Sequence, residues 1–173
     1  PRRNVMEHLE YVRDEDIPRF AELDVIPAMQ GRHITFYVDD GEAIMGSDRI
    51  KLAFRWRDIL DTGAIIATGS DYPVVSFNPG RCVYAAVTRQ HEDGHPKGGW
   101  LPEQRVSLAD VLRAYTYGSA CAINREDELG MLAPGMLADV TVWNCDLFSV
   151  PEEEYLNMHP AITMVDGRVV YEG

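Results

Sequence analysis

The chain has few cysteines, few basic residues relative to acidic ones, and no long apolar run. Its three cysteines are widely spaced and form no CxxC pair, which argues against a disulfide framework or a zinc ribbon and fits a reducing cytoplasm. No apolar stretch approaches the roughly 18 residues of a membrane-spanning helix, and the first residues do not resemble a signal peptide. We therefore expect a cytoplasmic protein with no membrane partner.

Basic residues are outnumbered: 16 lysines and arginines stand against 28 aspartates and glutamates, for a formal net charge of −12. Such an acidic surface repels nucleic-acid phosphates and anionic lipid, and no Lys/Arg cluster offsets the repulsion. Because 46% of the residues are hydrophobic, the chain has enough apolar material for a globular core. The composition therefore predicts a globular protein that does not bind nucleic acid.

Three short apolar runs, at residues 5–9, 25–29 and 64–69, are typical of buried strands. Helical patterns are expected at 16–23, at 47–63 and from Ser107 onward, where Ser107 and Asp110 have the spacing of a capping box. We expect a loop over about 79–102. The third run is apolar almost throughout, as in strands buried on both faces of a parallel sheet. The order of strands and helices predicts a parallel α/β architecture.

The last forty-odd residues follow a different pattern. Pro134-Gly135 indicates a turn, residues 139–143 a strand, and residues 163–171 a hairpin. Asp166-Gly167 at the centre of that hairpin is typical of a type I′ turn. We therefore expect a small β module attached to the α/β body.

Two residues capable of metal or acid–base chemistry follow predicted strands. His8 closes the first run and Asp71 follows the third, and function in parallel α/β folds collects at the carboxyl ends of strands. An imidazole and a carboxylate on different strand ends can converge on one ion. However, an Asp before a turn often bonds only its own backbone, so taken alone these two residues leave a structural role open.

One apparent motif is rejected. Residues 91–95, His-Glu-Asp-Gly-His, spell the HExxH pattern of zincin proteases. That motif requires a helix that places both histidines on one face, whereas Asp-Gly inside it and Pro96 after it disfavour a helix. We expect His91 and His95 to lie in an exposed loop and to share no metal.

Several segments, taken in order, resemble the amidohydrolase superfamily, in the branch that includes N-substituted formamide deformylase. The segment Gly69–Val74 is similar to its GSDxPV motif at the end of the eighth barrel strand, and Glu7-His8 to its "EH" at the end of the sixth. Three further segments resemble its last barrel helix, its entry into the β-sandwich and its closing hairpin: 108–120, 129–140 and 165–171. The resemblance covers nearly the whole chain at sensible spacings.

The resemblance implies a fold and a site. Residues 1–128 would be the C-terminal part of a (β/α)8 TIM-type barrel, with about three strands, and residues 129–173 part of a small β-sandwich. It implies that His8 and Asp71 are metal ligands and that Asp71 is the general base. Gln30 and His33 are candidates for facing substrate, although a solvated loop is the alternative for His33. The intact protein would use a divalent metal, zinc above all, to hydrolyse an amide or related C–N bond of a small molecule.

Parts of the family's site are not in this sequence. A complete barrel needs about 250 residues, and the family also uses an HxH pair and ligands from strands four and five, for which this chain offers no candidates. We therefore expect part of a longer protein whose metal site is absent or incomplete in this chain, so that the chain alone is inactive. The alternative is a non-catalytic binding or assembly module on the same half-barrel. Unpaired strand edges would favour a homo-oligomer.

Overall fold

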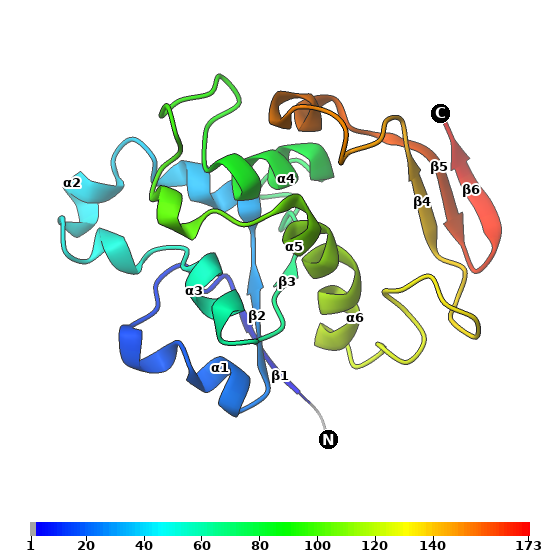
Figure 1. Cartoon of the computed structure of the whole chain (residues 1–173), viewed down its shortest axis with the longest axis horizontal. Helices are drawn as coiled ribbons and strands as arrows, with labels where there is room; N and C mark the ends of the chain where they lie inside the picture. The colour runs from blue at the N-terminus through cyan, green and yellow to red at the C-terminus, as the bar shows by residue number, and fades with distance from the viewer. Residues whose placement is uncertain (1–2) are drawn as a thin grey trace.

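The computed structural model describes residues 3–173, which form two sheets with helices between them (Figure 1). The first sheet is parallel, with the strands in the order β1 (Asn4–Glu7), β2 (Val25–Met29) and β3 (Ala67–Thr68). The second is antiparallel, in the order β4 (Val140–Trp143), β5 (Pro160–Val165) and β6 (Arg168–Glu172). The predicted parallel α/β body with a separate β module is confirmed, and the second strand lies between the other two.

The helical segments are short, and several lie on the side of the parallel sheet that is away from the antiparallel sheet (Figure 1). The α-helices are α1 (Arg19–Glu22), α2 (Gly41–Met45), α3 (Trp56–Asp61), α4 (Pro79–Thr88), α5 (Leu108–Arg113) and α6 (Ser119–Ala122). The 3-10 segments are η1 (Asp14–Asp16), η2 (Gly31–Phe36), η3 (Ile50–Leu52), η4 (Pro102–Gln104) and η6 (Glu152–Asn157), and η5 (Ala114–Gly118) is a π-helical turn that joins α5 to α6. Within residues 3–173, none of the helices is long and apolar enough to cross a membrane.

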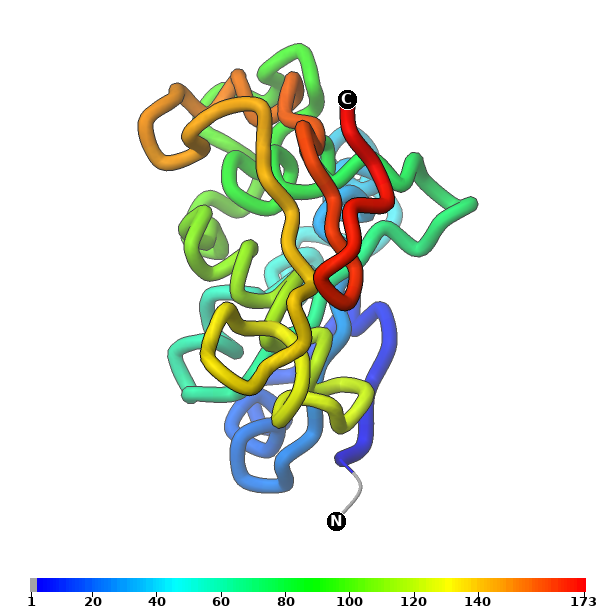
Figure 2. Tube along the Cα trace, turned by 90° about the vertical axis from the view of Figure 1, so that its right-hand side faces the viewer, coloured from blue at the N-terminus to red at the C-terminus, as the bar shows by residue number. Residues whose placement is uncertain are grey.

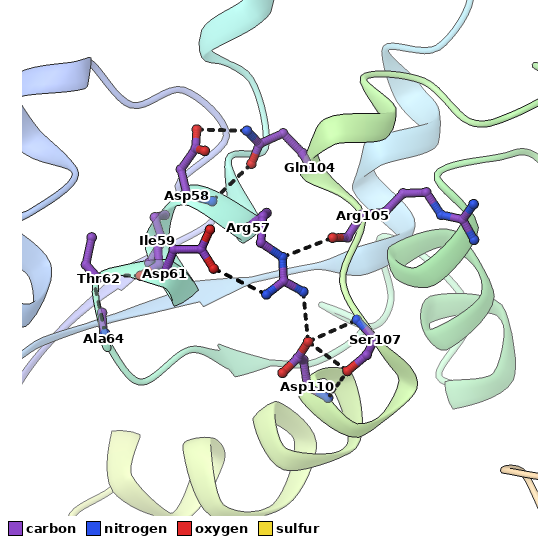
Figure 3. Close-up of polar contacts among 10 residues, drawn as sticks. All are labelled: Arg57, Asp58, Ile59, Asp61, Thr62, Ala64, Gln104, Arg105, Ser107 and Asp110. Carbon is purple, nitrogen blue, oxygen red and sulfur yellow. Dashed lines mark hydrogen bonds and ion pairs between the residues drawn. The ribbon is translucent and has the colours of Figure 1, made fainter.

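The capping box predicted at the start of α5 is confirmed. The Ser107 side chain accepts from the Asp110 N–H at 3.1 Å, and the Asp110 carboxylate accepts from the Ser107 N–H at 3.0 Å. Arg57, on α3, donates to the same carboxylate at 3.0 Å and joins the two helices (Figure 3). Burial opposes ionisation of Asp110, yet these hydrogen bonds keep its pKa below the ordinary value.

The loop predicted over 79–102 is wrong in its first half, where the structure has helix α4. The Asn78 side chain caps this helix by accepting from the Gly80 N–H at 2.9 Å, and Pro79 occupies its first turn. Proline is favoured at the first helical position, so Pro79 is compatible with the start of a helix. A buried run from Cys82 to Thr88 then fixes the helix against the core.

Two other predicted elements are shorter than expected. The helix predicted over 47–63 is interrupted at Phe54, whose φ of 46° is incompatible with a continuous helix, so η3 and α3 are separate. The strand predicted over 64–69 is regular only at Ala67–Thr68, although Ala64 and Ile66 are buried as expected. In both places tertiary packing overrides the local pattern.

The antiparallel sheet faces the viewer in Figure 2, in front of the helices. Asp166 and Gly167, at the β5–β6 turn, have φ values of 50° and 72°, the positive values that a type I′ turn requires at both central residues. The predicted hairpin is therefore confirmed. Strand β6 is exposed along its whole length.

The core joins the parallel sheet to the later part of the chain. Trp56, Met29 and Val83 are almost completely buried, and Tyr155 and Met158, from η6 and the residue after it, pack in the same cluster. Helix α4 and η6 approach so closely that a Cβ on Gly80 would lie 2.3 Å from the Tyr155 carbonyl oxygen. This contact anchors the segment before β5 to the α/β body.

Candidate functional site

The carboxyl ends of the three parallel strands bring the candidate site residues together. His8 directly follows β1, His33 lies on η2 just after β2, and Asp71 lies three residues after β3. Because the carboxyl ends of parallel strands all lie at the same end of a sheet, residues far apart in the sequence meet there. This is the geometry expected for His8 and Asp71.

One carboxylate oxygen lies between two imidazoles. Asp71 Oδ2 is 3.9 Å from His8 Nδ1 and 3.8 Å from His33 Nε2. The two rings stack, with centroids 5.7 Å apart and planes inclined by 8°. Within residues 3–173, these are the only three His, Cys, Asp or Glu residues whose potential ligand atoms all lie within 4.8 Å of one another. Two imidazoles and a carboxylate form a donor set that suits Zn²⁺ or a similar divalent ion.

His33 is the buried member of this group, with only 3% of its surface exposed. Its Nε2 atom is buried and has no hydrogen-bond partner among the described residues, although it points toward Asp71. A buried polar atom without a partner is costly and calls for an explanation. A metal ion bound between His33 Nε2 and Asp71 would satisfy this nitrogen, so the side chains at the site can accommodate a metal.

The backbone at the site is unusual for residues other than glycine. His8 has φ of 70°, Leu9 of 40° and Asp71 of 59°, in the left-handed region that L-residues rarely occupy. At Asp71 a turn closes through the Val74 N–H, which donates to the Asp71 carbonyl oxygen at 2.8 Å. Such conformations cost free energy and cluster at functional sites, so they are consistent with selection for side-chain placement here.

A carboxylate on the far side of His33 was missed in the sequence. Glu10 Oε1 lies 3.5 Å from His33 Nδ1, and its Oε2 accepts from the Tyr37 hydroxyl at 2.7 Å. Interaction with His33 and then the bond from Tyr37 keep the pKa of Glu10 below its ordinary value despite burial. The same bond raises the pKa of Tyr37 to about 12. Metal-ligating histidines commonly donate a hydrogen bond from their other ring nitrogen to a carboxylate. The position of Glu10, two residues after His8, was the signal in the sequence that could have indicated this role.

Gln30 lies at the end of β2, next to the site in sequence, and is 5% exposed. Its Oε1 is buried without a hydrogen-bond partner in the described part of the chain. None of the described hydrogen bonds joins it to His8 or Asp71. The structure therefore brings His33 into the cluster and leaves Gln30 beside it.

The HExxH look-alike is a turn, as predicted. The His91 N–H donates to the His95 carbonyl at 2.7 Å, and the Gly94 N–H to the His91 carbonyl at 2.9 Å. Gly94 has a φ of 84°. A zincin helix is therefore excluded at this position.

Comparison with known proteins identifies the family. The model of the amidohydrolase family matches residues 1–171, so the chain belongs to that family, and the resemblance found in the sequence is confirmed. The match includes the strand ends that carry His8, His33 and Asp71.

Particular relatives agree with the family match. N-substituted formamide deformylase of Arthrobacter pascens is 30% identical over 125 residues, covering 72% of this chain and 22% of the relative. Protein LONG AFTER FAR-RED 3 of Arabidopsis thaliana is 33% identical over 147 residues, covering 82% and 24%. A metal-dependent hydrolase of Pyrococcus horikoshii superposes with a TM-score of 0.73 at 30% identity, covering 86% of this chain and 30% of that one. The chain thus spans about a quarter of the length of these curated relatives.

Proposed function

We propose that this chain forms part of a metal-dependent hydrolase that cleaves an amide or related non-peptide C–N bond of a small molecule. In this proposal, residues 1–128 supply three strands of a (β/α)8 barrel, and residues 129–173 supply strands of a small β-sandwich. The observation that carries the proposal is the meeting of His8, His33 and Asp71 at the strand ends. Membership of the amidohydrolase family supports it.

His8, His33 and Asp71 would hold a divalent metal ion, and we propose zinc because imidazole and carboxylate suit it. When bound, such an ion polarises a carbonyl oxygen and lowers the pKa of water. The His33 ring would be oriented by Glu10, which lies 3.5 Å from its Nδ1. We propose that this orientation makes His33 a ligand, in place of the substrate-facing role expected from the sequence.

Asp71 is the residue that we propose as the general base. Its side chain is about one-third exposed, so it can contact both the ion and a substrate that approaches from solvent. It would accept a proton from the attacking water and return it to the leaving nitrogen. Gln30, buried beside the site, remains the candidate for orienting the substrate.

Metal binding tests the site directly. Zn²⁺ is titrated into the chain, and binding is followed by calorimetry. The number of bound Zn²⁺ ions per chain should fall by one in both Asp71→Asn and His8→Ala. The matched control is Asp48→Asn, an exposed loop aspartate outside the site. Unchanged Zn²⁺ stoichiometry in both site variants would overturn the proposal.

Hydrolysis tests the reaction. N-substituted formamides are the first substrates to assay, with amine release as the readout, because one relative carries that activity in its name. We expect the 173-residue chain alone to stay at background, because its sequence contains no HxH pair. Turnover by this chain that Asp71→Asn abolishes would refute the expected inactivity and strengthen the assignment to Asp71.

We also propose that the chain self-associates. Among the described residues, β1 and β3 each pair only with β2. The outer edge of β1 is exposed, whereas β3 is buried and its Thr68 carbonyl accepts from the Ser119 hydroxyl. An exposed edge is a template for pairing with another chain. Exposed apolar side chains, including Met6 on β1 and Val169 and Val170 on β6, add to the surface that association would bury.

A further inference from the structure

The two histidines of the rejected HExxH pattern face a carboxylate from another part of the chain. His91 Nε2 lies 3.2 Å from Asp39 Oδ2, and His95 Nε2 lies 3.8 Å from Asp39 Oδ1. The two rings are nearly parallel, at 10°, with centroids 6.4 Å apart. Each oxygen of one carboxylate is therefore approached by a different imidazole.

The loop that carries the histidines is held in this arrangement by its own hydrogen bonds. The Gln90 side-chain amide donates to the carbonyls of Gly94 at 2.8 Å and Pro96 at 2.9 Å. The His91 N–H donates to the His95 carbonyl at 2.7 Å. Because the backbone is fixed on both sides of the turn, His91 and His95 are kept on the same side without a helix.

Binding capacity at this cluster is unused. Nε2 of His91 is buried and makes no well-aligned hydrogen bond in the described part of the chain, even though Asp39 is near. His95 and Asp39 have side chains that are 63% and 62% exposed. The ligand atoms of this cluster do not converge as closely as those of His8, His33 and Asp71, so the exposed His95 side chain must rotate toward His91 for both rings to reach one ion.

Glu92 does not compete for this position. It lies between two arginines, with Oε1 3.0 Å from Arg32 Nη2 and 3.6 Å from Arg81 Nη1. The glutamate that a zincin would use beside its metal is therefore neutralised by guanidinium groups. Asp39 takes the place of the carboxylate, and only the tertiary fold brings it to the histidines.

Against the expectation from the sequence that His91 and His95 share no metal, we propose that Asp39, His91 and His95 form a second metal site, for a divalent transition-metal ion such as Zn²⁺. Two imidazoles and one carboxylate, with water at a fourth position, match the ligand number and types that zinc accepts. An ion pair alone would add little, since exposed pairs contribute about 0–1 kcal/mol. The net charge of −12 further favours cation binding.

A metal at this site would tie two loops together. Asp39 belongs to the segment after η2, which carries His33, and the histidines belong to the loop that follows α4. Both segments follow strands whose ends form the first site. The second ion would therefore restrict loop movement beside the first site, without itself contacting His8 or Asp71.

The test removes the first site and then measures the second. Zn²⁺ or Co²⁺ is titrated into the 173-residue chain in an Asp71→Asn background, by calorimetry and by the visible absorption of Co²⁺. We expect one saturable equivalent. Adding His95→Ala or Asp39→Asn should weaken its affinity by at least about tenfold, the scale seen even for outer-sphere changes at metal sites. Both residues are exposed, so these variants should keep the fold, which circular dichroism checks.

The matched control is His159→Ala, which removes another exposed histidine outside the cluster and should leave the affinity unchanged. Absence of saturable binding in the Asp71→Asn background overturns the second site, as does binding that survives either added substitution. Neither result bears on the first site, whose failure would appear instead as unchanged stoichiometry in Asp71→Asn itself.

Discussion

Arg89 is the most informative residue for a stability test, because its side chain is completely buried and pairs with no carboxylate within residues 3–173. Its Nε donates to the Trp100 carbonyl at 2.6 Å and its Nη1 to the Phe54 carbonyl at 3.2 Å, while the guanidinium lies 5.4 Å from the Trp100 ring centroid. Burial lowers the pKa of Arg89 to about 9, so it remains charged at neutral pH. This charge holds the loop after α4 against the residues before α3.

We expect Arg89→Ala to lower the free energy of unfolding by about 3–5 kcal/mol, because it leaves a cavity and removes the hydrogen-bond donor of the Trp100 carbonyl. Arg89→Met fills the volume but still leaves the Trp100 carbonyl without its donor, so about 1–3 kcal/mol should be lost. The Phe54 carbonyl keeps a second donor, the Trp56 N–H at 2.9 Å. Replacing a buried charge by an apolar residue can stabilise a protein when its partner is also replaced. Here the partners are backbone groups and cannot be removed.

Urea unfolding followed by circular dichroism, with linear extrapolation, gives the required free energies. Arg168→Met is the control, because Arg168 is exposed on β6 and should change stability by less than about 0.5 kcal/mol. An Arg89→Met protein as stable as the parent would refute the reasoning. It would mean that desolvation of the guanidinium cancels its hydrogen bonds.

Three further predictions concern other parts of the fold. The pKa of Asp110 is lowered in the folded chain, so below the ordinary value of 3.8 the unfolded chain binds more protons and the free energy of unfolding falls as pH falls. Asp110→Asn, which weakens the pair with Arg57, should make the free energy of unfolding depend less on pH in acid unfolding. Gly80→Ala should destabilise the protein by about 1–3 kcal/mol, because its Cβ would overlap the Tyr155 carbonyl oxygen. The control is Gly69→Ala, whose Cβ meets nothing within 4 Å. Equal thermal unfolding temperatures for the two variants would contradict the packing argument. Sedimentation at micromolar concentration should show a species larger than a monomer, and a monomer at all concentrations would refute the proposed self-association.

Local sequence signals determined much of this protein. Runs of apolar residues specified the three parallel strands, and Asp166-Gly167 specified the β5–β6 turn, because hydrophobic period and turn chemistry act over a few neighbouring residues. The same logic placed His8 and Asp71 at strand ends, and the motif around Asp71 identified the family. These features depend on short segments and on the rule that the carboxyl ends of parallel strands lie at one end of the sheet.

Tertiary structure decided the features that depend on contacts between distant segments. Residues 79–88 are helical because their apolar side chains find the core, although Pro79 and Gly80 resemble a loop. His33 joins the first site only through the register of β2 against β1 and β3. Asp39 meets His91 only because two loops cross in space. No local pattern encodes such meetings, since side chains remote in sequence converge only after the strands have paired and the core has closed.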